Sequence, residues 1–326
     1  MLSASDIVRI PYTPDLSEGG IAYACRSLAY TYDRMGGSPV ERMRRIAAGV
    51  AVELAFRRHL GRQGVPFDVL GATPFTDPDH YDLSLGGHRC DLKSYHITRR
   101  EQIDLLRRDP SAALPAPALV PLDQFAAEGH RADDLYLFAF LLGEMTARSE
   151  EVDRLIAAGK PACLVHPLPA DWARPHPWVP LAPLAMKSEC DSLVALELGG
   201  QDAERNFITQ RVELSPRQRI LIPGDWHSLA YMKCAHRPGR RIGLHSPVHA
   251  ETYLIPSIDW GNVWIDGEAV LLLGWLTHEQ FRRRSRLLNA GVRTFQYART
   301  RTKNLAVPLA ELEPLGPLFE RLAASA

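Results

Sequence analysis

Apolar runs separate more polar stretches of this chain, and two of these runs dominate the pattern. LYLFAFLLG occupies residues 135–143 and AVLLLGWL occupies residues 269–276. Strands that are buried on both faces have nearly continuous apolar sequences of this length. We therefore predict that both runs are central strands of one sheet.

The spacing of apolar residues predicts a helix from Ser38 to about Leu60. Pro39 at its first position and Glu41 three residues after Ser38 complete a capping-box pattern. The apolar side chains recur three or four residues apart: Met43, Ala47, Val50 and Leu54. Other expected elements are helices over 17–35 and 98–108, a strand over 65–73, a turn at 76–79 and a second capping box from Thr277 to Gln280.

Between about 160 and 262, prolines and glycines are frequent and short β-like runs alternate with turns. Because this region lies between the two apolar strands, we predict a β-rich module that is inserted into one α/β core. Residues 1–150 would then form the first part of the core, and residues 263–326 its last part. Two sequential domains that divide near residue 150 are the alternative.

Composition narrows the function only a little. The length of 326 residues suggests about two domains, and the 38 basic side chains equal the 38 acidic ones, so the overall charge indicates no partner. The five cysteines form no CxxC pair and their number is odd, which argues against a disulfide framework or a zinc ribbon; we expect small buried side chains. No apolar run approaches the ~20 residues of a membrane span, and the N-terminus lacks a signal-peptide pattern. A cytoplasmic protein without membrane contact is therefore expected.

The segment YDLSLGGHRCDLKSY, residues 81–95, predicts a hairpin. Its central Gly-Gly suits a two-residue turn, because glycine readily adopts the positive φ angles that such turns require. Counting outward from this turn gives the expected cross-strand pairs: Leu85 with His88, Ser84 with Arg89, Leu83 with Cys90, and Asp82 with Asp91. Lys93, two residues beyond Asp91, would share the face of the two aspartates.

Two aspartates directly opposite each other destabilise a sheet unless one is protonated or a cation lies between them. A divalent metal is a common solution, and Mg²⁺ takes one or two carboxylates together with water and substrate phosphate. The ammonium of Lys93 could hold a water or stabilise charge that develops on a phosphate. Asp82, Asp91 and Lys93 therefore fit metal-assisted cleavage of a phosphodiester.

Asp82, followed nine positions later by Asp91-Leu92-Lys93, resembles the PD-(D/E)xK nuclease superfamily, which includes many restriction endonucleases and related repair and defence nucleases. The resemblance implies an α/β restriction-endonuclease-like core, in which helices flank a mixed sheet, with the β-rich module inserted. It also implies that Asp82 and Asp91 bind Mg²⁺, for which Mn²⁺ would substitute, and that Lys93 helps to activate the attacking water. Glu53, on the helix before the sheet, matches the family's glutamate by position and would assist as a ligand or through water.

The family pattern covers residues 40–95 and extends more weakly to the strand at 134–142. Tyr81 stands where the motif often has proline, and Asp91 stands where glutamate is commoner. The chain also lacks a phosphate-binding glycine loop, a G-x-S-x-G elbow and a dinucleotide fingerprint, which disfavours an ATPase, an α/β-hydrolase or a dehydrogenase.

A surface for a polyanion is predicted in residues 281–304, where Phe295 and Tyr297 alternate with basic side chains and no acid interrupts. The basic residues of this segment are Arg282, Arg283, Arg284, Arg286, Arg293, Arg299, Arg301 and Lys303. Such clusters neutralise phosphates and release counterions, so DNA is the expected partner. A solvated helix face is the alternative.

The expected function is that of a Mg²⁺-dependent DNA endonuclease of a restriction, defence or repair type. By analogy with restriction-type enzymes, a homodimer is expected, and the β-rich module would select the target or mediate assembly. The alternative is a catalytically silent module that binds nucleic acid or protein on a degenerate nuclease fold. The complete set of three acids and a lysine favours the enzyme.

Overall fold

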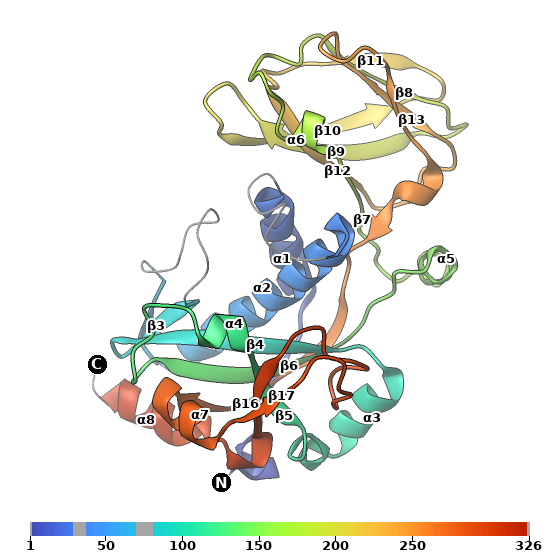
Figure 1. The fold of residues 1–326 in the computed structure, drawn as a ribbon. Coiled ribbons are helices and arrows are strands. Elements are labelled where there is room, and N and C mark those ends of the chain that lie inside the picture. Colours follow the sequence, from blue (N-terminus) through green and yellow to red (C-terminus); the bar gives the residue numbers. More distant parts are fainter. Residues whose placement is uncertain (1, 29–36, 70–80, 325–326) are drawn as a thin grey trace. The chain divides into compact units, whose positions relative to one another are not determined.

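The computed structural model describes residues 2–28, 37–69 and 81–324, which form a mixed α/β structure (Figure 1). The chain divides into two compact units. Unit 1 contains Met1–Gly19, Ala48–Glu144 and Gly267–Ala326, and unit 2 contains Gly20–Ala47 and Met145–Asp266. All four residues of the predicted acidic site belong to unit 1.

A six-stranded mixed sheet forms the centre of unit 1. Its strands, in spatial order, are β1 (Val8–Pro11), β16 (Asp266–Thr277), β6 (Leu135–Glu144), β4 (His88–Ile97), β3 (Leu83–Leu85) and β2 (Phe67–Asp68). Strand β4 is parallel to β6, whereas β1 with β16, β2 with β3 and β3 with β4 are antiparallel pairs. The two apolar runs are thus neighbours in the middle of the sheet, as predicted, and their side chains are almost entirely buried.

A smaller antiparallel sheet of unit 1 consists of β17 (Arg286–Leu288), β18 (Asn304–Pro308) and β5 (Pro117–Pro121). The helices of this unit after the central hairpin are α3 (Arg100–Arg108), α4 (Leu122–Phe125), α7 (His278–Arg284) and α8 (Leu315–Ala324). Short 3₁₀ turns occur at Ala4–Asp6, Pro110–Ala113 and Leu309–Glu311. One apolar core joins the two sheets and α7, because Phe138 and Phe140 of β6, Val120 of β5 and Phe281 of α7 belong to the same buried cluster.

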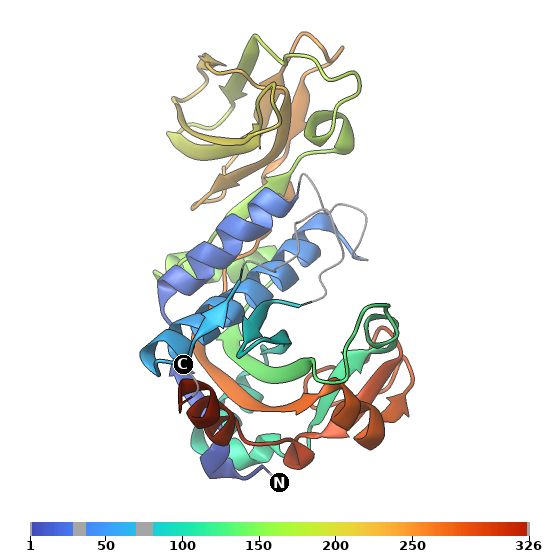
Figure 2. The same ribbon diagram turned by 90° about the vertical axis from the view of Figure 1, so that its left-hand side faces the viewer.

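Helix α2 (Pro39–Arg62) crosses one face of the central sheet with its C-terminal part (Figure 2). Gly49 faces Ser94 of β4, and a Cβ at this glycine would lie 3.9 Å from the serine oxygen. The predicted capping box is confirmed: the Ser38 amide donates to Glu41 Oε2 at 3.0 Å, and the Glu41 amide donates to Ser38 Oγ at 3.3 Å.

The other sequence predictions hold in part. Helix α1 (Pro14–Ser27) begins three residues earlier than expected, because Pro14 occupies its start, where a missing amide proton costs nothing. The second capping box, from Thr277 to Gln280, is confirmed at the start of α7. Residues 29–35 of the predicted helix, 70–73 of the predicted strand and the turn at 76–79 lie outside the described residues.

Tyr95 joins β4 to the free edge of β5. Its buried hydroxyl donates to Leu119 O at 2.5 Å and accepts from Leu119 N at 2.7 Å. Tyr95→Phe leaves both backbone groups unpaired in the core, and we expect it to lower the free energy of unfolding by about 1–3 kcal/mol. Urea denaturation measures this loss, and hydrogen exchange at the Leu119 amide locates it. Equal stability of Tyr95→Phe and wild type would contradict the expectation.

Unit 2 contains two antiparallel sheets. The five-stranded sheet has β10 (Phe207–Leu214), β9 (Val194–Gln201), β12 (Ser228–Cys234), β7 (Leu164–Pro167) and β15 (Gly261–Asn262) in spatial order. The four-stranded sheet has β11 (Arg219–Ile222), β8 (Leu184–Ser188), β13 (Ile242–His245) and β14 (Tyr253–Ile255). The short elements are α5 (Ser149–Ala157), α6 (Ala170–Ala173) and the 3₁₀ turn Ser257–Asp259.

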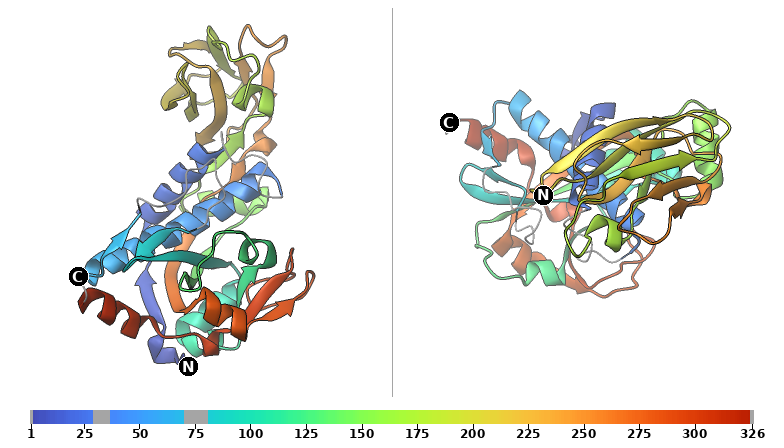
Figure 3. Two further views of the ribbon diagram at one scale, coloured as in Figure 1. Left: turned by 60° about the vertical axis from the view of Figure 1, so that its left-hand side comes forward. Right: turned by 90° about the horizontal axis from the view of Figure 1, so that it is seen from above.

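The two sheets of unit 2 share one apolar core (Figure 3). Leu196 and Leu198 of β9 belong to the same buried cluster as Leu184 of β8 and Leu244 of β13. Unit 2 also includes residues 20–47, which the sequence had assigned to the core. The predicted module, residues 160–262, therefore has other boundaries than unit 2, which contains Gly20–Ala47 and Met145–Asp266. Its insertion into an α/β core stays a prediction.

Two expectations from composition concern the whole chain. All five cysteines are buried and free. Within the described ranges, no helix has both the length and the apolar character that crossing a membrane requires.

Candidate active site

The hairpin that carries the aspartates has the predicted turn and register. Gly86 and Gly87 both have positive φ angles, 54° and 83°, and the three inner cross-strand pairs are those expected. The tip of the hairpin packs against α8, since a Cβ at Gly86 would lie only 2.3 Å from Leu322 Cδ2. The positive φ angle favours glycine at this position, and any larger residue would also displace the Leu322 side chain.

Asp82 lies just beyond the last regular pair of the hairpin. Strand β3 begins at Leu83, and the Asp82 amide donates to Cys90 O at 2.8 Å. The prediction that Asp82 and Asp91 form the next regular pair is therefore not borne out in detail. Instead, Asp82 Oδ2 accepts a hydrogen bond from the Leu92 amide of β4 at 2.6 Å. The carboxylate thus binds a backbone amide that a carbonyl of a neighbouring strand would otherwise bind.

Asp91 and Lys93 point to one face of β4 and contact each other. Lys93 Nζ lies 2.6 Å from Asp91 Oδ2 and donates to Gln124 Oε1 of α4 at 2.8 Å. Both charged side chains are largely buried, with 20% and 16% of their surfaces exposed. The ammonium is therefore held between an acid of its own strand and an amide from α4.

Helix α2 brings Glu53 and Arg57 to the same place. These residues are one helical turn apart, and Arg57 Nη2 lies 3.4 Å from Glu53 Oε2 and donates to Asp82 O at 3.3 Å. Arg57 Nε is buried without a hydrogen-bond partner among the described residues. Arg57 thus connects the helix to the start of β3.

The electrostatics show that the three carboxylates converge. Burial, then the negative charges of Glu53 and Asp91, raise the pKa of Asp82 well above its ordinary value. The Leu92 amide and Lys93 act in the opposite direction. The structure therefore places Asp82 within electrostatic reach of Glu53, Asp91 and Lys93, and Asp91 and Lys93 are the pair among the four that it shows in direct contact.

Sequence reasoning missed two side chains of this site. Arg57 had a local signal, because residues four apart on a helix are neighbours and Glu53 was already a candidate. Gln124 had none, since it reaches Lys93 only through the packing of α4 beside β4 (Figure 1).

The donor atoms of the site suit a hard cation, because Glu53, Asp82 and Asp91 offer only carboxylate oxygens. Among residues 2–28, 37–69 and 81–324, no group of three or more His, Cys, Asp or Glu side chains stands close enough to hold a metal ion as it is. Lys93 supplies the positive charge on Asp91 instead. The residues thus fit Mg²⁺ by chemical type, and the repulsion acting on Asp82 is what such an ion would relieve.

Three of the eight predicted basic residues pair with nearby acids. Arg282 and Arg283 both pair with Glu279, at 2.8 and 2.7 Å, and Arg284 pairs with Glu313 at 2.9 Å. Both acids lie outside residues 281–304 in the sequence. The charge expected from the segment alone was therefore too high. The first turn of a helix favours an acid such as Glu279.

The rest of the segment keeps exposed charge. Arg286, Arg293, Arg299 and Lys303 are exposed and make no ion pair with the described part of the chain.

Two contacts place this segment beside the acidic site in unit 1. The Leu122 amide at the start of α4 donates to Lys303 O at 3.0 Å, and the Tyr297 ring meets Tyr95 edge-on at 6.1 Å between centroids. Tyr95 lies two residues after Lys93 and hence on the same face of β4.

No family model, curated protein or solved structure matches this chain. Membership of the PD-(D/E)xK superfamily therefore stays a prediction, which depends on the residues around Asp82 and on their geometry.

Proposed function

We propose that this chain is a Mg²⁺-dependent endonuclease that hydrolyses phosphodiester bonds of DNA, on a restriction-endonuclease-like core. The three carboxylates and one lysine that influence one another around Asp82 carry the proposal. Nothing in the apolar packing of unit 1 calls for three acids there, and burial together with the charges of Glu53 and Asp91 raises the pKa of Asp82. A site that tolerates such strain is a candidate for function.

Each residue has a role in this proposal. Asp82 and Asp91 would hold Mg²⁺, with Glu53 in support, and the ion would supply positive charge to the phosphoryl oxygens. Lys93 positions the attacking water, because its ammonium is fixed by Asp91 and Gln124 and retains a further proton to donate. The water oxygen would add to phosphorus as the bond from phosphorus to the leaving oxygen breaks. The water would lose a proton to solvent, and the leaving oxygen would take up a proton from solvent.

The exposed basic residues of 281–304 would bind the DNA backbone beside this site. Arg286, Arg293, Arg299 and Lys303 keep their charge available, and the contact between Tyr297 and Tyr95 lies on the face that carries Lys93. Phosphate contacts of this kind position a duplex without reading its sequence.

The test is the metal dependence of cleavage. Purified protein is expected to nick supercoiled plasmid in millimolar Mg²⁺ or Mn²⁺ and to leave it intact in EDTA, because the acids alone cannot neutralise the phosphate. A matched RNA substrate in parallel measures the preference for DNA. Binding of DNA without cleavage in either metal would reject the enzyme and favour a binding module.

A further inference from the structure

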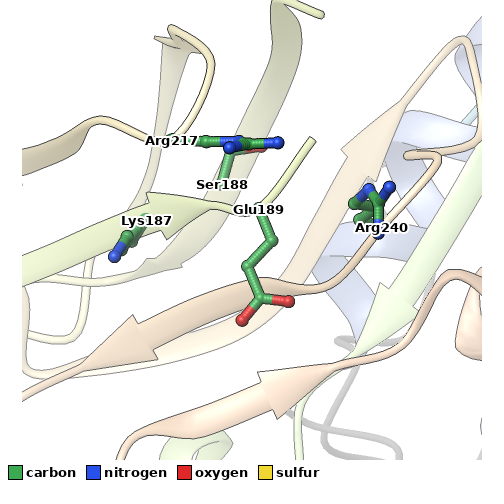
Figure 4. Close-up of a pocket in the computed structure, with 5 residues that line it drawn as sticks. All are labelled: Lys187, Ser188, Glu189, Arg217 and Arg240. Carbon is green, nitrogen blue, oxygen red and sulfur yellow. The ribbon is translucent and has the colours of Figure 1, made fainter. Parts of the chain in front are cut away.

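Unit 2 has a basic surface cavity at one end of its four-stranded sheet. The cavity has a volume of about 300 Å³ and is lined by Lys187, Ser188, Glu189, Arg217 and Arg240 (Figure 4). Three of these five side chains are cations from three separate segments: β8, the turn before β11, and the loop before β13. Packing does not require such a gathering, because all three cations are exposed at the surface.

Lys187, which lines the cavity, has a second cation, Arg219, as its direct cross-strand neighbour. Arg219 of β11 lies opposite Lys187 of β8 in the antiparallel register, and on its other side Lys187 lies opposite Gly243, which has no side chain to balance it. Neither cation makes a hydrogen bond or ion pair with the residues that the structure describes. Like charges directly opposite each other destabilise a sheet, so this pair favours an anion from outside.

Arg217 keeps an unfavourable backbone conformation beside the same cavity. Arg217 has a φ of 58°. It follows Pro216 in a turn that is closed by a hydrogen bond from the Gln218 amide to Ser215 O at 3.2 Å. A turn of this kind normally has glycine or asparagine at the position of positive φ, and an arginine there is strained. The side chain, rather than the backbone, must therefore account for arginine at this position.

The acids around the cavity do not balance its cations. Arg217 and Arg240 share Asp191, at 2.7 and 3.3 Å, and Glu189 pairs with Arg241 at 2.9 Å. Three cations line the cavity, and two more, Arg219 and Arg241, are a cross-strand neighbour and an ion-pair partner of lining residues. Glu189 and Asp191 are the two carboxylates that pair with members of this group.

We propose that Lys187, Arg217, Arg219 and Arg240 form a phosphate-binding site that holds the backbone of a DNA duplex. Guanidinium groups with parallel donors and an ammonium beside them match the oxygens of a phosphodiester. The choice of DNA as the source of the phosphate rests on the proposed function. The site adds a second, independent DNA contact in unit 2.

The experiment measures duplex DNA binding by the full chain in EDTA, by fluorescence anisotropy at several salt concentrations. Arg217→Gly relieves the backbone strain, so we expect an unchanged or higher Tm together with a Kd weakened roughly 3- to 10-fold. Arg219→Glu creates an opposite-charge pair with Lys187, so we expect a Tm raised by about 1–3 °C. Its Kd should weaken roughly 5- to 30-fold, with the salt slope lowered by about one phosphate contact.

Arg154→Glu, an exposed arginine of α5 outside the cavity, is the matched control with the same change in net charge. It should alter the Kd by less than about twofold. If these arginines had a purely structural role, Arg217→Gly and Arg219→Glu would lower the Tm. The proposed binding role instead predicts an unchanged or higher Tm for both variants. Weakened binding without loss of stability therefore supports the site.

Three results would overturn the inference: site variants that bind like Arg154→Glu, a wild type that does not bind duplex DNA, or variants that lose binding to phosphatidylserine vesicles but not to DNA. Because binding is measured without metal, the outcome is independent of cleavage. A chain that cleaves plasmid but shows equal Kd values keeps its proposed function and loses this site. A chain that binds through this site but never cleaves loses only the proposed function.

Discussion

Asp91→Ala and Lys93→Ala are each expected to lower Mg²⁺-dependent cleavage by at least about 100-fold, in line with the loss of one group that acts on transition-state charge. Asp91 contributes a metal-binding oxygen and also fixes the Lys93 ammonium, at 2.6 Å. Arg57, the cation that the described residues place beside Asp82, is engaged with Glu53 and the Asp82 carbonyl and is not expected to replace Lys93. Plasmid nicking under single-turnover conditions measures the loss.

Binding separates a catalytic effect from a folding defect in this pair of variants. Duplex affinity in EDTA should stay within about threefold of wild type, because the exposed cations of the basic segment are unchanged. Asp133→Ala is the matched control, since it removes an aspartate that is 61% exposed in its side chain and pairs with His88. Nicking by all three variants at the wild-type rate would reveal a contaminating nuclease and end the assignment.

Asp82→Asn is expected to stabilise the metal-free protein at neutral pH and to abolish its response to metal. Burial and the charges of Glu53 and Asp91 raise the pKa of Asp82 above the unfolded value. A carboxyl of this kind favours folding fully below its unfolded pKa, near 3.8, and the benefit is lost as pH rises toward the folded pKa. Asparagine stays neutral throughout, and its Oδ1 can still accept from the Leu92 amide.

Thermal unfolding in EDTA between pH 4 and pH 8 measures this effect. The Tm of Asp82→Asn should exceed that of wild type by a few degrees at neutral pH, and the gap should narrow toward pH 4. Mn²⁺ should raise the Tm of wild type but not that of the variant. Asp133→Asn, as the exposed control, should follow wild type. A gap that widens toward acid pH would mean that the Asp82 charge stabilises the fold.

Local patterns predicted those parts of the fold that depend on neighbours in sequence. The two capping boxes followed from three-residue spacings at Ser38 and Thr277, and the hairpin register followed from the Gly-Gly turn. The central strands followed from composition alone, because only buried strands are apolar on both faces. Each of these features has its cause within a dozen residues.

The features that sequence could not provide depend on side-chain and tertiary contacts that residue spacing does not specify. Asp82 departs from the regular register because its carboxylate bonds to the Leu92 amide, and Gln124 reaches Lys93 only once α4 has packed. Glu313 neutralises Arg284 through a contact that requires the end of β16 to lie beside the chain before α8. The assignment of residues 20–47 to unit 2 likewise has no local signal.

The packing of Gly86 against Leu322 sets an order of events during synthesis. The hairpin that aims both aspartates leaves the ribosome early, whereas α8, which covers its tip, follows after the whole of unit 2. Strand β16, which lies beside β6, also follows the segment Met145–Asp266 of unit 2. The nascent chain therefore carries the acids long before these neighbours exist, so the hairpin gains its contact with α8 only after the segment through α8 has emerged.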